Sequence, residues 1–197
     1  MKRAANLAAV FIDRDGTLIR EVNHLTAIEQ IEILPGVTAA LRRLRTHGFK
    51  LVMVTNQSVV ARGALSEAGL EKIHAEIVGR LAQDDARLDA IYYCPHHPTE
   101  GLGEYRTVCD CRKPKTGMIR RAAAELQVDP TRSYMVGDQL TDMELARAVG
   151  ATGILVGRDE VAAGTGLPEN YLSVSDLNAA ASWIVERLRL PQQGCES

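Results

Sequence analysis

Short apolar runs alternate with segments of helical periodicity along most of this 197-residue chain. Apolar runs that end at turn residues are typical of buried parallel strands. The predicted strands cover residues 7–12, 50–55, 88–93, 133–136 and 153–156, with a short further strand near Leu172. Because strands that alternate with helices form βαβ units, the pattern predicts an α/β fold, with a parallel sheet and helices on both of its faces.

Five helices are predicted between and after these strands. The first follows Pro35-Gly36, repeats apolar residues at helical spacing over residues 37–44, and ends at Gly48. The second begins near Ser66, a residue type that caps helix N-termini. The other three are residues 118–126, a helix opened by the capping box Thr141-x-x-Glu144, and residues 176–190.

The length and the 46% hydrophobic content suffice for one ordinary core. We therefore expect a single domain over residues 1–190 and a frayed tail at 191–197. The formal charge of −2 provides no basic field for nucleic acid and no polybasic segment for a membrane. Residues 1–12 imitate part of a signal peptide but lack a cleavage region, and no stretch approaches the ~20 apolar residues that span a bilayer. The composition favours a cytoplasmic monomer whose partners are small molecules.

The sequence Asp13-Arg14-Asp15-Gly16-Thr17 directly follows the first predicted strand. The carboxyl ends of strands are where open α/β sheets place ligands. Two acids two positions apart lie on one side of an extended chain, so one can attack an electrophile while the other transfers protons. Arg14 is expected to point away from them, exposed or supporting. An isolated Asp/Gly motif is also compatible with a solvated turn, so the rest of the chain has to decide.

Three further segments at predicted strand ends carry residues suited to phosphoryl transfer: Thr55-Asn56-Gln57-Ser58, Arg112-Lys113-Pro114 and Gly137-Asp138-x-x-x-Asp142. Each alone is as compatible with a strand end, a solvated loop charge or a turn as with a site. Together with Asp13 and Asp15, in this order, they resemble the haloacid-dehalogenase (HAD) superfamily of aspartate-nucleophile phosphatases. The resemblance implies a HAD-like Rossmannoid three-layer fold with strand order 5-4-1-2-3. Asp13 and Asp138, after the first and fourth strands, would then face each other.

The chemistry of a phosphate monoester indicates a metal site among these acids. The dianion repels a carboxylate, so attack by Asp13 requires a cation between them, and Mg²⁺ held by oxygen ligands supplies it. We expect Asp13, the backbone carbonyl of Asp15 and Asp138 to bind this Mg²⁺. Asp142 is expected to lie behind these ligands.

The same chemistry predicts the remaining catalytic groups. The transferring group spreads its negative charge over three oxygens and requires fixed donors, for which we expect the Thr55 hydroxyl and the Lys113 ammonium group. The Asp15 carboxyl group would give a proton to the departing sugar oxygen and later take one from the hydrolytic water.

Residues 94–115 show no steady periodicity and contain Pro, Gly, His and three of the four cysteines. A loop of this length needs something to order it. Three thiolates and one imidazole suit a closed tetrahedral Zn²⁺ in a reducing compartment, and they would come from Cys94, His96, Cys109 and Cys111.

The short C-x-H and C-x-C spacings are also compatible with free buried thiols, and His97 is the alternative to His96 as a ligand. A zinc clip over residues 94–113 would fix the adjacent cations Arg112 and Lys113 without taking part in the chemistry. Cys195, in the tail, is expected to be a free thiol.

Within the superfamily, the chain resembles the bacterial D-glycero-D-manno-heptose 1,7-bisphosphate phosphatases along nearly its whole length. The motifs that carry this resemblance are Phe11-Ile-Asp-Arg-Asp-Gly-Thr17, Val54-Thr-Asn-Gln-Ser58, Ala61-Arg62-Gly63, Ile91-Tyr-Tyr-Cys-Pro-His-His-Pro98 and Cys109-Asp-Cys-Arg-Lys-Pro114. It implies removal of the 7-phosphate, catalytic Mg²⁺, structural Zn²⁺ and no large cap domain. The β anomer, used on the ADP-heptose route to lipopolysaccharide, is favoured.

Without a large cap, specificity has to come from short loops, which we expect to be residues 20–24, residues 56–62 and the zinc loop. Arg112 would recognise the substrate. Six more residues are expected to contact it: Asn56, Gln57, Ser58, Glu21, His24 and Gln139. The last three depart from the family pattern, which usually has Asp and Tyr at the first two of these positions and often Lys at the third.

Two other hypotheses remain open. Histidinol-phosphate phosphatases share the nucleophile motif, the zinc-loop chemistry and the Cys-Arg-Lys-Pro ending, but they usually have a shorter interval than the twelve residues between His96 and Cys109. The second is a zinc-containing phosphosugar-binding module without activity. The intact acids, Thr55 and Lys113 favour an enzyme.

Overall fold

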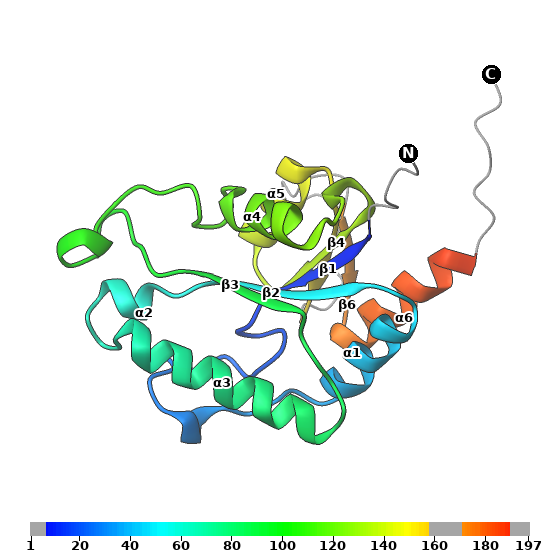
Figure 1. Ribbon diagram of the computed structural model, residues 1–197, viewed down its shortest axis with the longest axis horizontal. Coiled ribbons are helices and arrows are strands. Elements are labelled where there is room, and N and C mark those ends of the chain that lie inside the picture. Colours follow the sequence, from blue (N-terminus) through cyan, green and yellow to red (C-terminus); the bar gives the residue numbers. More distant parts are fainter. Residues whose placement is uncertain (1–6, 158–170, 190–197) are drawn as a thin grey trace.

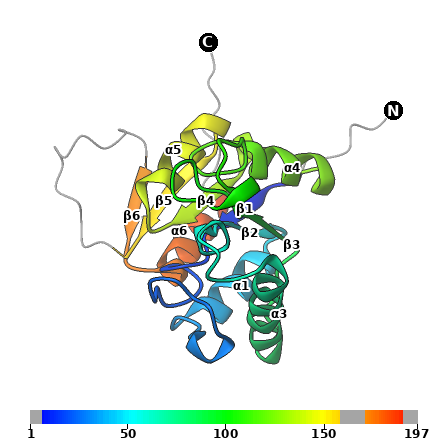
Figure 2. The same ribbon diagram turned by 90° about the vertical axis from the view of Figure 1, so that its left-hand side faces the viewer.

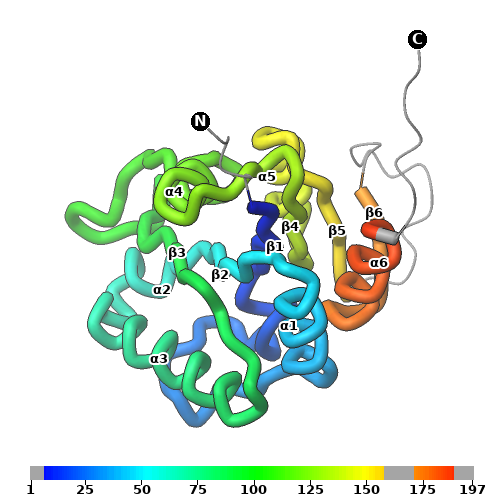
Figure 3. The backbone as a smooth tube through the Cα atoms, turned by 45° about the vertical axis from the view of Figure 1, so that its right-hand side comes forward, coloured from blue at the N-terminus to red at the C-terminus, as the bar shows by residue number. Residues whose placement is uncertain are grey.

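The strands of this chain form one parallel sheet. The computed structural model describes residues 7–157 and 171–189. Its strands are β1 (Ala9–Ile12), β2 (Lys50–Asn56), β3 (Ala90–Cys94), β4 (Tyr134–Gly137), β5 (Thr152–Val156) and β6 (Tyr171–Val174). They lie in the order β3-β2-β1-β4-β5-β6, and every neighbouring pair is parallel (Figure 3). The predicted core order 5-4-1-2-3 is confirmed, and β6 extends the sheet beyond β5.

Helices cover both faces of this sheet, as Figures 1 and 2 show. One face carries α1 (Val37–Thr46), α3 (Glu67–Gln83) and α6 (Leu177–Arg189), and the other carries α4 (Gly117–Leu126) and α5 (Leu140–Val149). The predicted three-layer arrangement is therefore confirmed.

The connections out of β1 and β2 are short. The first contains a 3-10 turn (Ile28–Gln30) and α1, and the second contains the four-residue helix α2 (Ser58–Ala61) and α3. Neither connection carries a large cap domain, as predicted. Two further 3-10 turns, Gly103–Tyr105 and Pro130–Arg132, lie in the later loops. Neither α2 nor these turns were predicted from the sequence, because one turn of helix is too short to establish a periodicity.

The central strand β1 is fully buried on both faces. Val10 and Ile12 belong to the apolar cluster shared with α1, α3 and α6, whereas Ala9 and Phe11 belong to the cluster on the α4 side. A strand enclosed in this way explains the unbroken apolar run in the sequence. It also delivers the residue after Ile12 to the centre of the sheet edge.

Two predicted helix starts have different outcomes. The Ser66 hydroxyl accepts the Gly69 N–H at 3.1 Å, so this N-cap is confirmed. The capping box Thr141-x-x-Glu144 is wrong, because α5 begins at Leu140 and the Asp142 carboxylate accepts the Gln139 N–H at 3.2 Å. An acid in the first helical turn satisfies the orphan N–H groups that the sequence pattern assigned to a threonine.

None of the helices in the described residues is long and apolar enough to cross a membrane. The predicted tail at 191–197, with Cys195, lies outside the described residues. The single domain over residues 1–190 stays a prediction.

Candidate active site

The predicted acids meet where β1 and β4 end. The Asp13 N–H donates to the Val136 carbonyl at 2.9 Å, so the chain stays in the sheet one residue beyond β1. Asp138 follows the neighbouring strand β4. Carboxylate oxygens of Asp13, Asp138 and Asp142 all lie within 4.8 Å of one another. One cation can therefore contact the side chains at 13 and 138.

Lys113 lies inside this group of acids. Its ammonium nitrogen is 2.7 Å from Asp13 Oδ1 and 2.8 Å from Asp142 Oδ1, and it donates to the Val54 carbonyl at 3.1 Å. The Lys113 side chain is only 3% exposed. The Lys113 ammonium group, which belongs to a loop in the sequence, therefore lies at the carboxyl end of β2 and in contact with Asp13, the candidate nucleophile.

Burial dominates the electrostatics of this group. It raises the pKa of Asp13 to about 6, although Lys113 acts in the opposite direction. Burial also raises the pKa of Asp138 and that of Asp142. For Lys113, burial favours the neutral amine, but the carboxylates of Asp13 and Asp142 outweigh it and the pKa is raised. The raised pKa of Lys113 favours its ammonium form, whereas burial disfavours the ionised form of the three acids. A divalent ion among them would offset this cost by stabilising the carboxylates.

The oxygen atoms of this group suit a hard divalent ion. Asp138 Oδ1 is buried and has no hydrogen-bond partner within the described part of the chain, while its Oδ2 accepts from Gln139 Nε2 at 2.8 Å. A buried carboxylate oxygen without a partner is costly unless a ligand satisfies it. Gly16 has a φ of +71°, and a Cβ there would overlap the Asp138 carboxylate. The donor set and the close approach of the backbone fit Mg²⁺.

Asp13 presents its two carboxylate oxygens differently. Oδ1 accepts a hydrogen bond from the Arg14 N–H at 2.7 Å and forms the ion pair with the Lys113 ammonium group. No hydrogen bond within the described residues reaches Oδ2. One oxygen therefore orients the side chain, and the other is left for a metal or an electrophile.

The second acid of the motif is held by a different pair of residues. Arg14 donates to Asp15 through Nε at 3.0 Å and through Nη2 to both carboxylate oxygens at 2.8 Å, and Gln57 Nε2 donates to Asp15 Oδ2 at 2.9 Å. Arg14 was expected to be exposed or supporting and to point away from the acids. It is 2% exposed and holds Asp15, so its role is the supporting one, and the expected direction of its side chain is wrong. The chain leaves the extended conformation after Asp13, so strand alternation no longer applies at position 14.

The residues after β2 support the catalytic candidates. The Thr55 hydroxyl accepts from Gln57 Nε2 at 2.8 Å and keeps its own proton to donate. Asn56 Oδ1 accepts the Lys113 N–H at 2.9 Å, and Asn56 Nδ2 donates to the Lys113 carbonyl at 3.2 Å. Gln57 and Asn56 were predicted to contact substrate, and here they position Thr55, Asp15 and Lys113.

The predicted zinc ligands also come together. The Sγ atoms of Cys94, Cys109 and Cys111 are 3.0, 3.1 and 3.5 Å apart, and His96 Nδ1 is 3.3 Å from Cys111 Sγ and 3.8 Å from Cys94 Sγ. These separations exceed the ~2.05 Å of a disulfide. They are somewhat shorter than the roughly 3.8 Å between sulfurs on a tetrahedron with Zn–S bonds near 2.3 Å. The cluster is compatible with a closed zinc site.

His97 does not belong to this cluster. Its Nδ1 accepts the Glu100 N–H at 3.0 Å and caps the following turn. Burial raises the pKa of the Cys94 thiol and raises that of Cys111 to about 11, which a bound metal would reverse by favouring thiolates. Cys111, the last residue of the cluster, is two positions before Lys113 in the sequence. The cluster is therefore connected through the backbone to the lysine that contacts Asp13 and Asp142.

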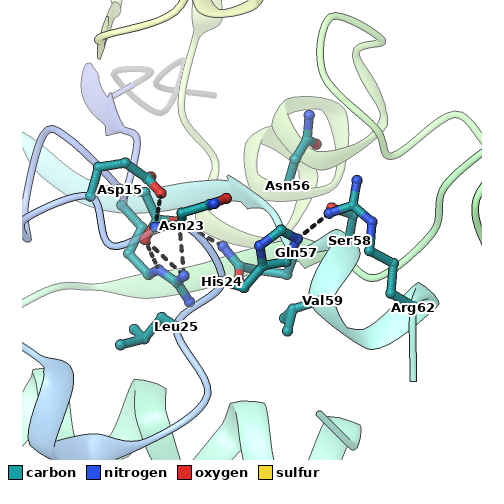
Figure 4. Close-up of a pocket in the computed structure, with 11 residues that line it drawn as sticks. Asp15, Asn23, His24, Leu25, Asn56, Gln57, Ser58, Val59 and Arg62 are labelled. Carbon is teal, nitrogen blue, oxygen red and sulfur yellow. Dashed lines mark hydrogen bonds and ion pairs between the residues drawn. The ribbon is translucent and has the colours of Figure 1, made fainter. Parts of the chain in front are cut away.

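Two adjoining hollows open above these side chains. The one at the acid group, about 200 Å³, is lined by Asp13, Asp15, Glu21, Thr55, Asn56, Lys113, Asp138, Gln139 and Thr141. The other, about 180 Å³, is lined by Arg14, Asp15, Glu21, Asn23, His24, Leu25, Asn56, Gln57, Ser58, Val59 and Arg62 (Figure 4). Six of the seven predicted substrate contacts therefore border a hollow.

The seventh, Arg112, lines neither of these hollows and donates to the His96 carbonyl at 3.1 Å. Arg62 lies in the predicted specificity loop of residues 56–62, but it was not predicted among the substrate contacts. Its side chain reaches the hollow only through the tertiary arrangement of the loops after β1 and β2, for which the sequence has no local signal.

Comparison with known proteins identifies the family. A HAD-hydrolase-like family model matches residues 110–180. The D-glycero-beta-D-manno-heptose-1,7-bisphosphate 7-phosphatase of Escherichia coli (strain K12) is 43% identical over 191 residues, which are 96% of this chain and 94% of that protein. The chain belongs to this phosphatase family. The member of the same name from Haemophilus influenzae (strain Rd) is 48% identical over 136 residues, 69% of this chain and 73% of that protein.

Solved structures of the family agree with the fold. The D,D-heptose 1,7-bisphosphate phosphatase from B. bronchiseptica, complexed with magnesium and phosphate, superposes with a TM-score of 0.80 at 34% identity, covering 92% of this chain and 99% of that one. The D,D-heptose 1,7-bisphosphate phosphatase from Burkholderia thailandensis has a TM-score of 0.66 at 27% identity, with coverages of 90% and 98%. The predicted enzyme class, a phosphoric monoester hydrolase, is confirmed by these relatives.

Proposed function

We propose that this protein removes the 7-phosphate of D-glycero-D-manno-heptose 1,7-bisphosphate in a Mg²⁺-dependent reaction that leaves heptose 1-phosphate. The β anomer is the preferred substrate, and the product enters nucleotide-activated heptose and lipopolysaccharide core biosynthesis. The observation that carries the proposal is the group formed by Asp13, Asp138 and Lys113, in which no residue of the described ranges hydrogen-bonds to Asp13 Oδ2. The names of the relatives at 43–48% identity supply the substrate.

Asp13 is the nucleophile. Its Oδ2 attacks the phosphorus of the 7-phosphate, and the bond from phosphorus to the sugar oxygen breaks as the aspartyl phosphate forms. Asp15, held by Arg14 and Gln57, gives its proton to the departing sugar oxygen. It then takes a proton from the water that attacks the aspartyl phosphate, so inorganic phosphate leaves and both acids are restored.

Two donors stabilise the transferring group. The Lys113 ammonium group and the Thr55 hydroxyl are fixed by their neighbours, so they need no reorganisation when charge develops on the phosphoryl oxygens. Mg²⁺, held by Asp13, the Asp15 carbonyl and Asp138, would neutralise part of the negative charge of nucleophile and ester. Asp142 orients Lys113 from behind these ligands.

The remaining assignments rest on the loop cluster and on composition. Cys94, His96, Cys109 and Cys111 would hold a structural Zn²⁺ with no open position. The absence of a large cap leaves substrate recognition to the short loops that line the two hollows. A cytoplasmic location and a monomeric state stay predictions.

The test is phosphate release from the β and α anomers of the heptose 1,7-bisphosphate and from histidinol phosphate, with and without Mg²⁺. We expect Mg²⁺-dependent loss of the 7-phosphate, assigned by ³¹P NMR, with the β anomer preferred. Asp13→Asn should lower kcat at least about 10³-fold, because an amide oxygen is a poor nucleophile. Asp85→Asn, the same change on an 83% exposed side chain, is the matched control.

The outcomes separate the three hypotheses. A preference for histidinol phosphate would assign the protein to that activity instead. Failure to release phosphate from any of these substrates, with Mg²⁺ present and the zinc cluster loaded, would favour the non-enzymatic binding module.

A further inference from the structure

Arg62 joins three loops that are far apart in the sequence. It follows α2, and its Nε donates to Glu100 Oε2 at 2.9 Å, with Nη2 on the same oxygen. Its Nη1 contacts His24 Nε2 (Figure 4). His24 belongs to the loop after β1, and Glu100 belongs to the loop that carries the Cys/His cluster. One guanidinium group therefore connects the loop after β1, the segment after α2 and the loop that carries the Cys/His cluster.

The hollow beside Arg62 continues into the catalytic one. Asp15, Glu21 and Asn56 line both of them. A ligand with one end at Asp13 can therefore extend toward Arg62 without leaving the concave surface. Such a ligand has room for a second polar group at the Arg62 end.

Glu100 is the acid among several basic side chains at this end. Its pKa is lowered first by the hydrogen bond from Arg62, and also by His97 and Arg112. The pair is solvent-accessible, since the Arg62 side chain is 34% exposed and that of Glu100 is 55% exposed. Exposed ion pairs contribute little to stability, so an incoming anion can displace this carboxylate at low cost.

A phosphate group is a stronger ligand for Arg62 than Glu100 is. It carries close to two negative charges and three acceptor oxygens, whereas the carboxylate carries one charge and two oxygens. Here Nε and Nη2 both donate to one oxygen of Glu100, whereas a phosphate can accept from the same edge of the guanidinium group through two oxygens. The internal ion pair therefore occupies the donor edge that a phosphate would use.

We propose that Arg62 binds the second anionic group of a bisphosphorylated sugar, and that Glu100 is a built-in competitor for the same guanidinium group. The inference deepens the proposed function and rests on it. Arg62 favours substrates with a phosphate at both ends, and Glu100 limits how tightly that second phosphate is held. Together they set the preference for a bisphosphate over a monophosphate.

The test compares two substrates that share the reacting end: heptose 1,7-bisphosphate and heptose 7-phosphate, which lacks the second anion. Arg62→Gln should raise KM for the bisphosphate roughly 10- to 100-fold with kcat nearly unchanged, because a charge-assisted hydrogen bond is lost. Glu100→Gln should lower that KM about 2- to 5-fold, because a competing charge is removed. KM for the monophosphate should change less than about 2-fold in both variants.

Two further variants serve as controls. Glu32→Gln breaks another exposed Arg–Glu pair, the 2.6 Å contact with Arg20, and should change neither KM. Arg62→Lys keeps the charge but not the bidentate geometry, so it should give an intermediate KM for the bisphosphate. Melting temperatures of all variants show whether the loops remain folded.

The possible failures are distinguishable. Parallel changes on both substrates, or a higher bisphosphate KM in Glu100→Gln, would overturn this inference while phosphatase activity persists. Absence of turnover of both substrates by the unmodified protein would overturn the proposed function, and this inference with it.

Discussion

Single buried side chains of the proposed active site are also held in ion pairs that bear on the stability of this protein. Lys113 is enclosed by Asp13, Asp142 and the Val54 carbonyl. Removing one partner of a buried ion pair typically costs about 3–5 kcal/mol, because the other charge is left uncompensated. Substitutions in this group therefore lower activity and stability together, and activity assays on such variants need a parallel measurement of unfolding.

His74 allows a separate prediction at this scale. It is 5% exposed and packs against Tyr93, and burial lowers its pKa to about 3, with Arg14 acting in the same direction. Below the unfolded value near 6.5, the unfolded chain takes up a proton that the folded protein refuses. Stability from this residue is thus present above pH 6.5 and is lost as the pH falls, by at most about 1.4 kcal/mol per pH unit.

His74→Leu should remove this dependence. In urea unfolding between pH 7 and pH 5, the stability of the unmodified protein should fall more steeply than that of the variant, with a difference of about 2 kcal/mol at pH 5. His47→Leu alters an exposed histidine and should leave the slope unchanged. Equal slopes for the unmodified protein and His74→Leu would contradict the prediction.

At the scale of elements, the Cys/His loop leads directly into Lys113, the residue we propose as a phosphate-binding group. The cluster ends at Cys111, and Asn56 holds both backbone groups of Lys113 against the end of β2. The backbone of Lys113 is therefore fixed from both sides, by the cluster and by the sheet. A metal in the cluster would stabilise this loop without contacting the substrate.

Removing the metal should therefore affect both stability and turnover. We expect about one zinc ion per chain by elemental analysis, and a lower melting temperature with reduced kcat after chelation. Cys111→Ser should behave like the stripped protein, and Cys195→Ser should behave like the unmodified one. An unchanged melting temperature after verified loss of zinc would contradict a structural role.

At the scale of the whole molecule, the strand order brings distant segments to one sheet edge. Because β1 and β4 are neighbours, the carboxylates of Asp13 and Asp138 lie close enough to share one cation although 124 residues separate them. A ligand that binds only this folded arrangement stabilises it by mass action. The metal group should therefore be detectable in a melting experiment without any substrate.

Adding Mg²⁺ should raise the melting temperature of the zinc-loaded protein. At a concentration 100 times the Kd, the gain is about 2.7 kcal/mol, or roughly 5–10 °C for a chain of this size. Because burial raises the pKa of Asp13 to about 6, the gain should shrink below that pH, where protons compete with the ion. Asp138→Asn should abolish most of the rise in melting temperature caused by Mg²⁺, whereas the control Asp85→Asn should keep it. A rise in Asp138→Asn equal to that of the unmodified protein would exclude the predicted site.

The sequence predicts those features that have local signals. The periodicity predicts the strands and long helices, and the position of Asp13 after an apolar run predicts where the acids lie. The hydrogen bonds that hold Asp15 have no such signal. Arg14 is the first residue after the chain leaves the extended conformation, so strand alternation does not predict its direction, and Gln57 reaches Asp15 from another loop. Arg62, Glu100 and His24 meet only through tertiary folding, so no spacing in the sequence indicates their contact.

The balance of charges around Lys113 also restricts which ions suit the site. Three carboxylates and one ammonium group leave two negative charges without compensation when all the acids are ionised. Sodium or potassium would offset only half of this excess and would leave the nucleophile repelling an anionic ester. We therefore expect the site to select its ion by valence as well as by the oxygen atoms it offers, with abundant alkali ions in a cell as weak competitors.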